Sequence, residues 1–152
     1  MNGGMELYLH MPFCVRKCAY CDFLSFPTDQ ETQNLYTRRL REDIDAMGKK
    51  YGDIPVDTIF IGGGTPSVPD SALIVGIMEH VRKAFHVAEG AEISMEANPG
   101  TVTREKLTDY RRAGINRLSF GLQSANDREL KLLGRIHTWA EFLESFHLAR
   151  EC

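Results

Sequence analysis

The sequence predicts an α/β protein with a parallel sheet, and two observations support this fold class. Strand-length apolar segments alternate four times with segments of helical periodicity along the 152 residues, a pattern that needs parallel strands joined by right-handed crossovers. The run from Val56 to Ile61 is rich in apolar and β-branched residues, as expected of a buried parallel strand. A complete barrel of this kind takes about 250 residues. We therefore expect a partial (β/α) barrel of about four strand–helix units.

The first strand is expected from Glu6 to Phe13, where apolar and polar side chains alternate. A cysteine-containing loop follows and runs to about Pro27. The side chains expected on the buried face of this strand are Leu7, Leu9 and Met11, with Tyr8 and His10 on the opposite face.

The first helix is expected to run from Thr28 to Met47. Thr28 and Glu31 have capping-box spacing at its start, and Gly48 stands where a helix C-cap is expected. The apolar side chains assigned to its inner face are Leu35, Leu40, Ile44 and Met47.

The second unit begins with the strand Val56 to Ile61, which we expect to be fully buried, and continues into the sequence GGGTPS. Pro69 and Asp70 are placed in the opening turn of the next helix. The apolar stripe of that helix is predicted to be Leu73, Ile77, Val81 and Phe85.

The third strand is expected over Glu92–Ala97, and the turn Asn98-Pro99-Gly100 ends it. Thr103 caps a third helix that Gly114 terminates. The inner face of this helix is predicted to be Leu107, Tyr110 and Ala113. A fourth strand is predicted over Ile115–Gln123. Two further helices are predicted over Asp127–Leu133 and Thr138–Arg150.

Composition limits the classes of function. The net charge is -3, and there is no run rich in Lys and Arg, so the chain has no electrostatic footprint for nucleic acid. No apolar run approaches the roughly 20 residues that span a bilayer. Three of the four cysteines are clustered within eight positions, and thiols of this kind stay reduced in the cytoplasm. A cytoplasmic protein without a membrane span is therefore expected.

Cys14, Cys18 and Cys21 form a CxxxCxxC motif, written CVRKCAYC, and three thiolates on one short loop can face one point. Three sulfur ligands suit a 4Fe-4S cluster whose fourth iron has no protein ligand. A structural zinc site would need four ligands, and no second CxxC or HxxxH pattern follows. Disulfides would need an oxidising compartment. Iron–sulfur binding is the favoured interpretation, with a zinc-binding interaction module as the alternative.

Other polar and glycine residues follow the remaining strands. They are Gly62 to Thr65, Glu96 and Gln123, and the ends of parallel strands meet at one edge of a barrel. Glu96 can accept from an ammonium or hydroxyl group, and the amides of Gly63 and Gly64 are expected to be exposed for a ligand. Together these groups suit a ligand with an amino group, a carboxylate and a ribose.

Four ordered motifs carry a family resemblance: YLHMPFCVRKCAYCDF, IGGGTPS, SMEANP and RLSFGLQS. They are similar to motifs of the radical S-adenosylmethionine (radical SAM) superfamily, within it the oxygen-independent coproporphyrinogen III oxidase group, and especially the HemW family of haem chaperones. The resemblance implies that residues 1–152 are the N-terminal part of a radical SAM core domain, with the rest of the barrel and a C-terminal domain lying outside them.

The resemblance also implies roles for individual residues. Cys14, Cys18 and Cys21 match the ligands of the 4Fe-4S cluster. The residues that match contacts of the cluster-bound S-adenosylmethionine are Tyr8, Gly63 and Glu96. Those that match a second S-adenosylmethionine site in the oxidase are Gly64, Thr65, Gln123 and Arg135.

The function implied is porphyrin or haem metabolism, with reductive cleavage of S-adenosylmethionine to methionine and a 5'-deoxyadenosyl radical. Phe23 stands where the oxidase group carries a further cysteine, which favours the HemW-like haem chaperone over the oxidative decarboxylation of coproporphyrinogen III to protoporphyrinogen IX. The expected partners are haem or a porphyrin, an electron donor such as a flavodoxin or ferredoxin, and a client protein that receives haem.

Overall fold

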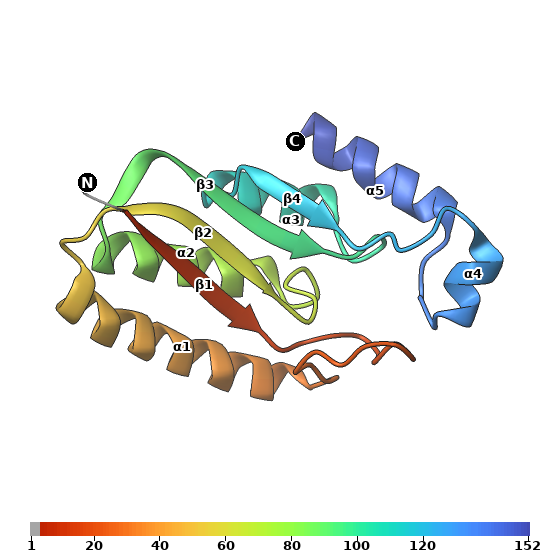
Figure 1. The fold of residues 1–152 in the computed structure, drawn as a ribbon, viewed down its shortest axis with the longest axis horizontal. Helices are drawn as coiled ribbons and strands as arrows, with labels where there is room; N and C mark the ends of the chain where they lie inside the picture. Colours follow the sequence, from red (N-terminus) through yellow and green to blue (C-terminus); the bar gives the residue numbers. More distant parts are fainter. Residues whose placement is uncertain (1–3) are drawn as a thin grey trace.

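A computed structural model describes residues 4–152, which form one parallel sheet with the strand order β1-β2-β3-β4. The strands and helices alternate as predicted (Figure 1), which confirms the α/β class. In the described residues the sheet is open, because β1 and β4 are its two edges. In chain order the elements are β1 (Met5–Met11), α1 (Gln30–Tyr51), β2 (Val56–Gly63), α2 (Ser71–Ala84), β3 (Val87–Ala97), α3 (Arg104–Arg112), β4 (Arg117–Phe120), α4 (Asp127–Leu132) and α5 (Trp139–Glu151).

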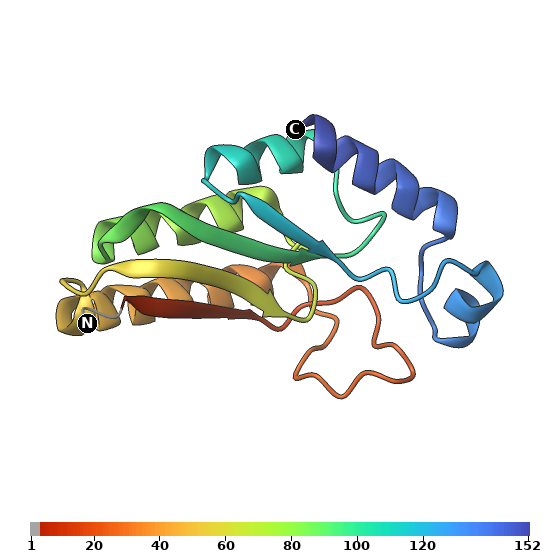
Figure 2. The same cartoon turned by 45° about the horizontal axis from the view of Figure 1, so that its top comes forward.

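Helices α1, α2 and α3 cover one face of the sheet, and α5 lies beside α3 (Figures 1 and 2). The core lies between these helices and the sheet, where Leu9, Ile61 and Met95 are buried. On the opposite face Tyr8 is 59% exposed and stacks on Phe60, with ring centroids 6.1 Å apart. The alternation predicted for β1 is therefore confirmed.

Strand β2 is longer and less buried than predicted. It runs to Gly63, and its pairing with β1 reaches Met11 opposite Gly63. Asp57 is exposed and Phe60 only half-buried. The prediction of a fully buried strand is wrong because the face opposite the helices is open along this part of the sheet.

The ends of α1 also differ from the prediction. Asp29, not Thr28, is the N-cap, because its carboxylate accepts from the Thr32 amide at 2.8 Å. The helix continues through Gly48, where a Cβ would lie 2.5 Å from the Cβ of Ala84. Gly48 therefore permits the close approach of α1 to the end of α2, and it does not terminate the helix. The helix ends at Gly52.

The inner face of α1 was only partly predicted. Ile44 is buried, whereas Leu35 and Met47 are 47% and 54% exposed. Leu35 lies five residues before Leu40, which places it about 140° away around the helix. Buried Gln33 and Thr37 take the places nearest the sheet, and Thr37 donates to the carbonyl of Gln33 at 2.9 Å. Polar residues therefore fill part of this interface.

The caps of the later helices follow local sequence rules. Asp70 is the N-cap of α2, so Pro69 and Asp70 precede the helix and are not inside it. Thr103 caps α3 as predicted, and Gly114 follows that helix with φ +90. A complete capping box is present at α5, between Thr138 and Glu141.

Strand β4 is shorter than the predicted Ile115–Gln123. Its pairing covers only Arg117 to Phe120, opposite the end of β3. After the bond from the Gly121 amide to the Ala97 carbonyl, at 3.0 Å, the chain leaves the sheet because β3 has ended. Within residues 4–152, no helix combines the length and apolar character needed to cross a membrane.

Candidate functional site

A cavity of about 300 Å³ opens at the carboxyl ends of the strands. The loop after β1 and the segment around α4 project beyond the sheet at this end (Figure 2). Parallel strands bring their C-terminal loops together at one edge, so residues distant in sequence meet here. Of the predicted site residues, those that line the cavity are Cys14, Cys18, Cys21, Gly63, Gly64, Thr65, Glu96, Gln123 and Arg135.

The three cysteines belong to a loop that is closed at its base. The amide of Phe26 donates to the Pro12 carbonyl at 2.9 Å, and the Cys14 amide donates back to Phe26 at 3.3 Å. All three thiols are free and half-buried. No set of three His, Cys, Asp or Glu side chains in residues 4–152 is arranged to hold a single metal ion.

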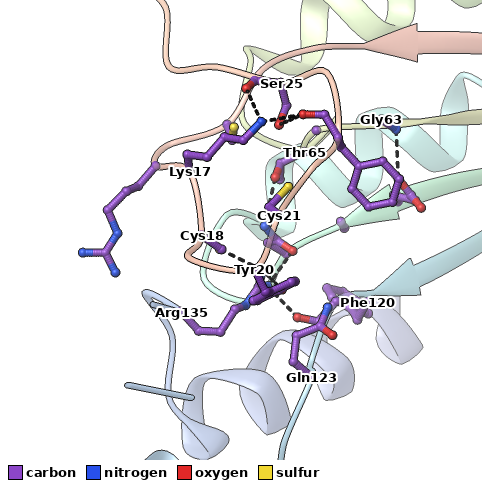
Figure 3. Close-up of a pocket in the computed structure, with 18 of the residues that line it drawn as sticks. Lys17, Cys18, Tyr20, Cys21, Ser25, Gly63, Thr65, Phe120, Gln123 and Arg135 are labelled. Carbon is purple, nitrogen blue, oxygen red and sulfur yellow. Dashed lines mark hydrogen bonds between the residues drawn. The ribbon is translucent and has the colours of Figure 1, made fainter. Parts of the chain in front are cut away.

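Two cations hold this loop in place. Lys17 reaches across it, and its ammonium donates to the carbonyls of Phe23 at 2.6 Å and Ser25 at 3.4 Å. Arg16 donates to the Gly134 carbonyl at 2.6 Å. Figure 3 shows Lys17 turned toward the return limb of the loop. The loop is therefore tied both to itself and to the segment before α5.

The amides of the glycine turn are already used. Gly63 donates to Oε2 of Glu96 at 3.0 Å, and the Gly64 and Thr65 amides donate to the carbonyls of Met11 at 2.8 Å and Phe13 at 2.6 Å. The prediction that these amides are exposed for a ligand is therefore wrong, because the Glu96 side chain takes the Gly63 amide and continued pairing with β1 takes the Gly64 amide. A Cβ on Gly64 would lie 2.5 Å from the Phe13 carbonyl oxygen, so this glycine permits close packing.

Glu96 and Tyr8 are coupled although Tyr8 does not line the cavity. Burial raises the pKa of Tyr8, and the negative charge of Glu96 raises it further. The Tyr8 hydroxyl is 3.0 Å from Nδ1 of His10, whose Nε2 is 3.0 Å from the Leu24 carbonyl. Because that carbonyl can only accept, Nε2 carries a proton and donates to it. His10 therefore links Tyr8 to the cysteine loop.

Arg135 joins the cysteine loop to the loops after β3 and β4. One guanidinium nitrogen, Nη1, is 3.7 Å from Cys18 Sγ and 3.4 Å from the Tyr20 hydroxyl. The other, Nη2, donates to Asn98 Oδ1 at 2.8 Å and to the Gly121 carbonyl at 2.5 Å. Its Nε is buried and has no hydrogen-bond partner in the described part of the chain.

Asn98 is a site residue that the sequence interpretation missed. We assigned it only to a turn, but its Nδ2 donates to the Thr65 hydroxyl at 2.9 Å and its Oδ1 accepts from Arg135. The available signal was its position two residues after Glu96, since alternate residues of a strand share a face.

Gln123 lies three residues beyond the end of β4 and is exposed at the cavity. Its φ is 70°, and among residues 4–152 it is the one non-glycine residue with a positive φ. Such conformations cost about 1–3 kcal/mol and gather at functional sites. The conformation of Gln123 is thus consistent with a functional position.

The chemistry of the cavity suits the cofactors that the sequence suggested. Free thiols on one loop are the ligands of iron–sulfur clusters. Glu96 has one carboxylate oxygen bound to Gly63 and the other unpaired within residues 4–152, while the Nε donor of Arg135 is unused. A carboxylate side chain and a guanidinium side chain that line one cavity match the ammonium and carboxylate of an amino-acid ligand.

Comparison with known proteins agrees with this chemistry. The Radical SAM superfamily profile matches residues 8–152. The chain is 45% identical over 139 residues to the heme chaperone HemW of Escherichia coli, covering 88% of this chain and 35% of that protein. It is 40% identical over 151 residues to HemW of Haemophilus influenzae, covering 96% of this chain and 39% of that protein.

A solved structure is also similar. Coproporphyrinogen III oxidase (HemN) from Escherichia coli, described as a radical SAM enzyme, matches with a TM-score of 0.91 at 29% identity, over 99% of this chain and 35% of that one. The chain therefore spans a little over a third of the length of these relatives.

Proposed function

Because this chain belongs to the radical SAM superfamily, we propose that it binds a 4Fe-4S cluster and S-adenosylmethionine and serves haem metabolism as part of a HemW-type haem chaperone. The observation that carries the proposal is the single cavity that Cys14, Cys18 and Cys21 line together with Glu96 and Arg135. The names of two curated relatives, at 45% and 40% identity, support the haem chaperone.

Cys14, Cys18 and Cys21 would hold the cluster. When bound and reduced, a cluster with an open iron supplies the electron that cleaves the sulfonium of S-adenosylmethionine. The chain contributes the placement of the thiols: Lys17 closes the loop, and the bond between Phe26 and Pro12 fixes its base. The shape of the cysteine loop is therefore held by these hydrogen bonds as well as by the conformational preferences of its residues.

Glu96 would hold the ammonium of S-adenosylmethionine, since one oxygen is anchored by Gly63 and the other is open to the ligand. Arg135 lines the same cavity and would place its positive charge beside the carboxylate. Tyr8, Gly63, Gly64, Thr65 and Gln123 complete the proposed contacts. The glycines act by allowing close approach, because their amides are already paired.

The experiment that tests the proposal is anaerobic reconstitution of the protein with iron and sulfide, followed by electron paramagnetic resonance of the reduced sample with and without S-adenosylmethionine. A 4Fe-4S signal that changes on addition of S-adenosylmethionine is expected. Replacing Cys14, Cys18 or Cys21 by Ser should remove it, whereas Cys152→Ser should not, because Cys152 lies at the end of α5 next to Arg104. A folded protein that holds zinc without iron or sulfide would support the interaction module.

The similarity to a solved oxidase structure supports a second candidate function. The fold matches coproporphyrinogen III oxidase with a TM-score of 0.91, so oxidative decarboxylation of coproporphyrinogen III is the alternative. Release of protoporphyrinogen IX by the reconstituted protein would establish it. Stoichiometric haem binding without turnover, followed by transfer to a client protein, would establish the chaperone.

The proposed partners follow from the proposed chemistry. A cluster that must be reduced needs an electron donor such as a flavodoxin or ferredoxin, and a chaperone needs a client that accepts haem. Free cysteines at a cavity persist in a reducing compartment, which supports the cytoplasm as the place of action.

A further inference from the structure

Asn98 lies where three segments around the cavity meet, and the proposed function leaves it without a role. Its amide nitrogen is 2.9 Å from the Thr65 hydroxyl, and its amide oxygen is 2.8 Å from Nη2 of Arg135. Thr65 comes from the turn after β2 and Arg135 from the segment between α4 and α5, while Asn98 itself follows β3. One side chain therefore joins all three.

The orientation of the Asn98 amide is fixed by these partners. A guanidinium can only donate, so Asn98 must turn its oxygen toward Arg135. The amide nitrogen then faces Thr65 and can only donate, so the hydroxyl oxygen of Thr65 must accept. The hydroxyl proton of Thr65 is left over, because within residues 4–152 the Thr65 hydroxyl accepts from Asn98 and donates no hydrogen bond. Thr65 is therefore a free donor beside the cavity.

The backbone of Asn98 is held by a closed ring of hydrogen bonds. The Asn98 amide donates to the Ser67 hydroxyl at 3.2 Å, and the Thr101 hydroxyl donates to the Asn98 carbonyl at 2.7 Å. Since the one hydroxyl proton of Thr101 is used, Ser67 must donate to Thr101 across the 2.5 Å between their oxygens. Each group in the ring donates and accepts once, and Ser67 is fully buried. The Asn98 side chain thus starts from a rigid base.

Asn98 and Arg135 also pack against Gly121, the residue directly after β4. A Cβ on Gly121 would lie 2.7 Å from Oδ1 of Asn98 and 3.3 Å from Nη2 of Arg135. The Gly121 carbonyl also accepts from that Nη2 at 2.5 Å. Arg135 is therefore bound by two oxygens through one nitrogen, and its other nitrogen is held toward Cys18 and Tyr20 (Figure 3).

We propose that Asn98 is a positioning residue that commits the Thr65 hydroxyl to donate into the cavity and holds the Arg135 guanidinium against the cysteine loop. The inference rests on the proposed function for its ligand: the acceptor that Thr65 serves is the carboxylate of bound S-adenosylmethionine. An aspartate at position 98 has the same shape and still accepts from Arg135. It also accepts from Thr65, and so withdraws the hydroxyl proton from the ligand.

The test is a double-mutant cycle in the cluster-loaded protein, with S-adenosylmethionine binding measured by anaerobic calorimetry. Asn98→Asp and Thr65→Val should each weaken binding about tenfold, the effect of one lost hydrogen bond. The double variant should bind no more weakly than Thr65→Val alone. Asn34→Asp, which adds the same charge on the exposed surface of α1, should bind as the wild type does. If the new charge acted only by repelling the ligand, the two effects would add, and additivity would overturn the proposal.

A second measurement needs neither cluster nor ligand. In urea unfolding of the cluster-free protein, Asn98→Ala and Thr65→Val should be coupled, so that the double variant loses less stability than the two single variants together. Coupling in a protein that takes up no cluster would refute the proposed function while the positioning role of Asn98 holds. A protein that binds cluster and S-adenosylmethionine but shows no coupling would refute the role of Asn98.

Discussion

Gly64→Ala tests whether the cysteine loop depends on its packing against the glycine turn. The added Cβ would lie 2.5 Å from the Phe13 carbonyl oxygen and 3.0 Å from the Cβ of Ser25, whereas ordinary contacts begin at 3.4 Å. Phe13 and Ser25 belong to the two limbs of the loop, and the Phe13 carbonyl already accepts from the Thr65 amide. The loop must therefore move away from β2. Overpacking of this kind costs about 1–3 kcal/mol, which lowers the melting temperature by about 2–12 °C.

The strain-free backbone of Gly64 makes this a purely steric change, because its φ is not positive. Gly90→Ala is the matched control: Gly90 has φ +80 and nothing within 4 Å of the added Cβ, so it costs about 1–2 kcal/mol through backbone strain alone. Melting curves of the cluster-free proteins should show similar losses of stability. Iron and acid-labile sulfide after reconstitution should fall only in Gly64→Ala. Wild-type iron content in Gly64→Ala, or an equal loss in Gly90→Ala, would refute the reasoning.

Glu96→Gln keeps an acceptor for the Gly63 amide but loses the charge, so S-adenosylmethionine should bind at least about tenfold more weakly at normal cluster content; unchanged affinity in calorimetry would exclude Glu96 as the ammonium acceptor. Lys17→Met removes the bonds to Phe23 and Ser25, and hydrogen exchange of residues 14–26 in the cluster-free protein should quicken about tenfold. The same exchange rate as in wild type would show that Lys17 does not close the loop. Burial lowers the pKa of His137 below 6.5, and the positive charge of Arg135 lowers it further. The stability linked to neutral His137 is therefore complete above about pH 6.5 and is lost as the pH falls through the lowered folded-state pKa. Urea unfolding at about pH 7.5 and about pH 5 should show a smaller loss for His137→Gln than for wild type, and equal losses would contradict this assignment.

Sequence periodicity predicted the fold well wherever one face of an element is buried. The alternation of Leu7, Leu9 and Met11 places β1 correctly, and Thr103 marks the start of α3. The ends of α1 were wrong because they depend on facts outside the local sequence. Two adjacent capping residues, Thr28 and Asp29, compete at its start, and at its end Gly48 is retained by contact with Ala84 in α2.

Nine of the ten predicted site residues line one cavity, whereas Tyr8 does not and Asn98 was missed. Strand ends converge in any parallel barrel, so the sequence alone could place Glu96 and Thr65 near the cysteines. The use of the glycine amides could not be foreseen, because it depends on how far the pairing of β1 and β2 extends. Nor could spacing reveal that Arg135 reaches Cys18, since 117 residues separate them.

The polar groups of the cavity divide into those that the protein satisfies and those that it leaves open. Asn98, Gly63 and Lys17 have their hydrogen bonds made within the chain. The Nε of Arg135 is buried without a partner in residues 4–152, and an unsatisfied buried donor costs about 1–3 kcal/mol. Glu96, which has one carboxylate oxygen without a partner in residues 4–152, and Thr65 line the same cavity. Groups left open at one cavity, beside neighbours that are fully paired, are better explained by a ligand that completes them than by imperfect packing, because imperfect packing would not select complementary donors and acceptors.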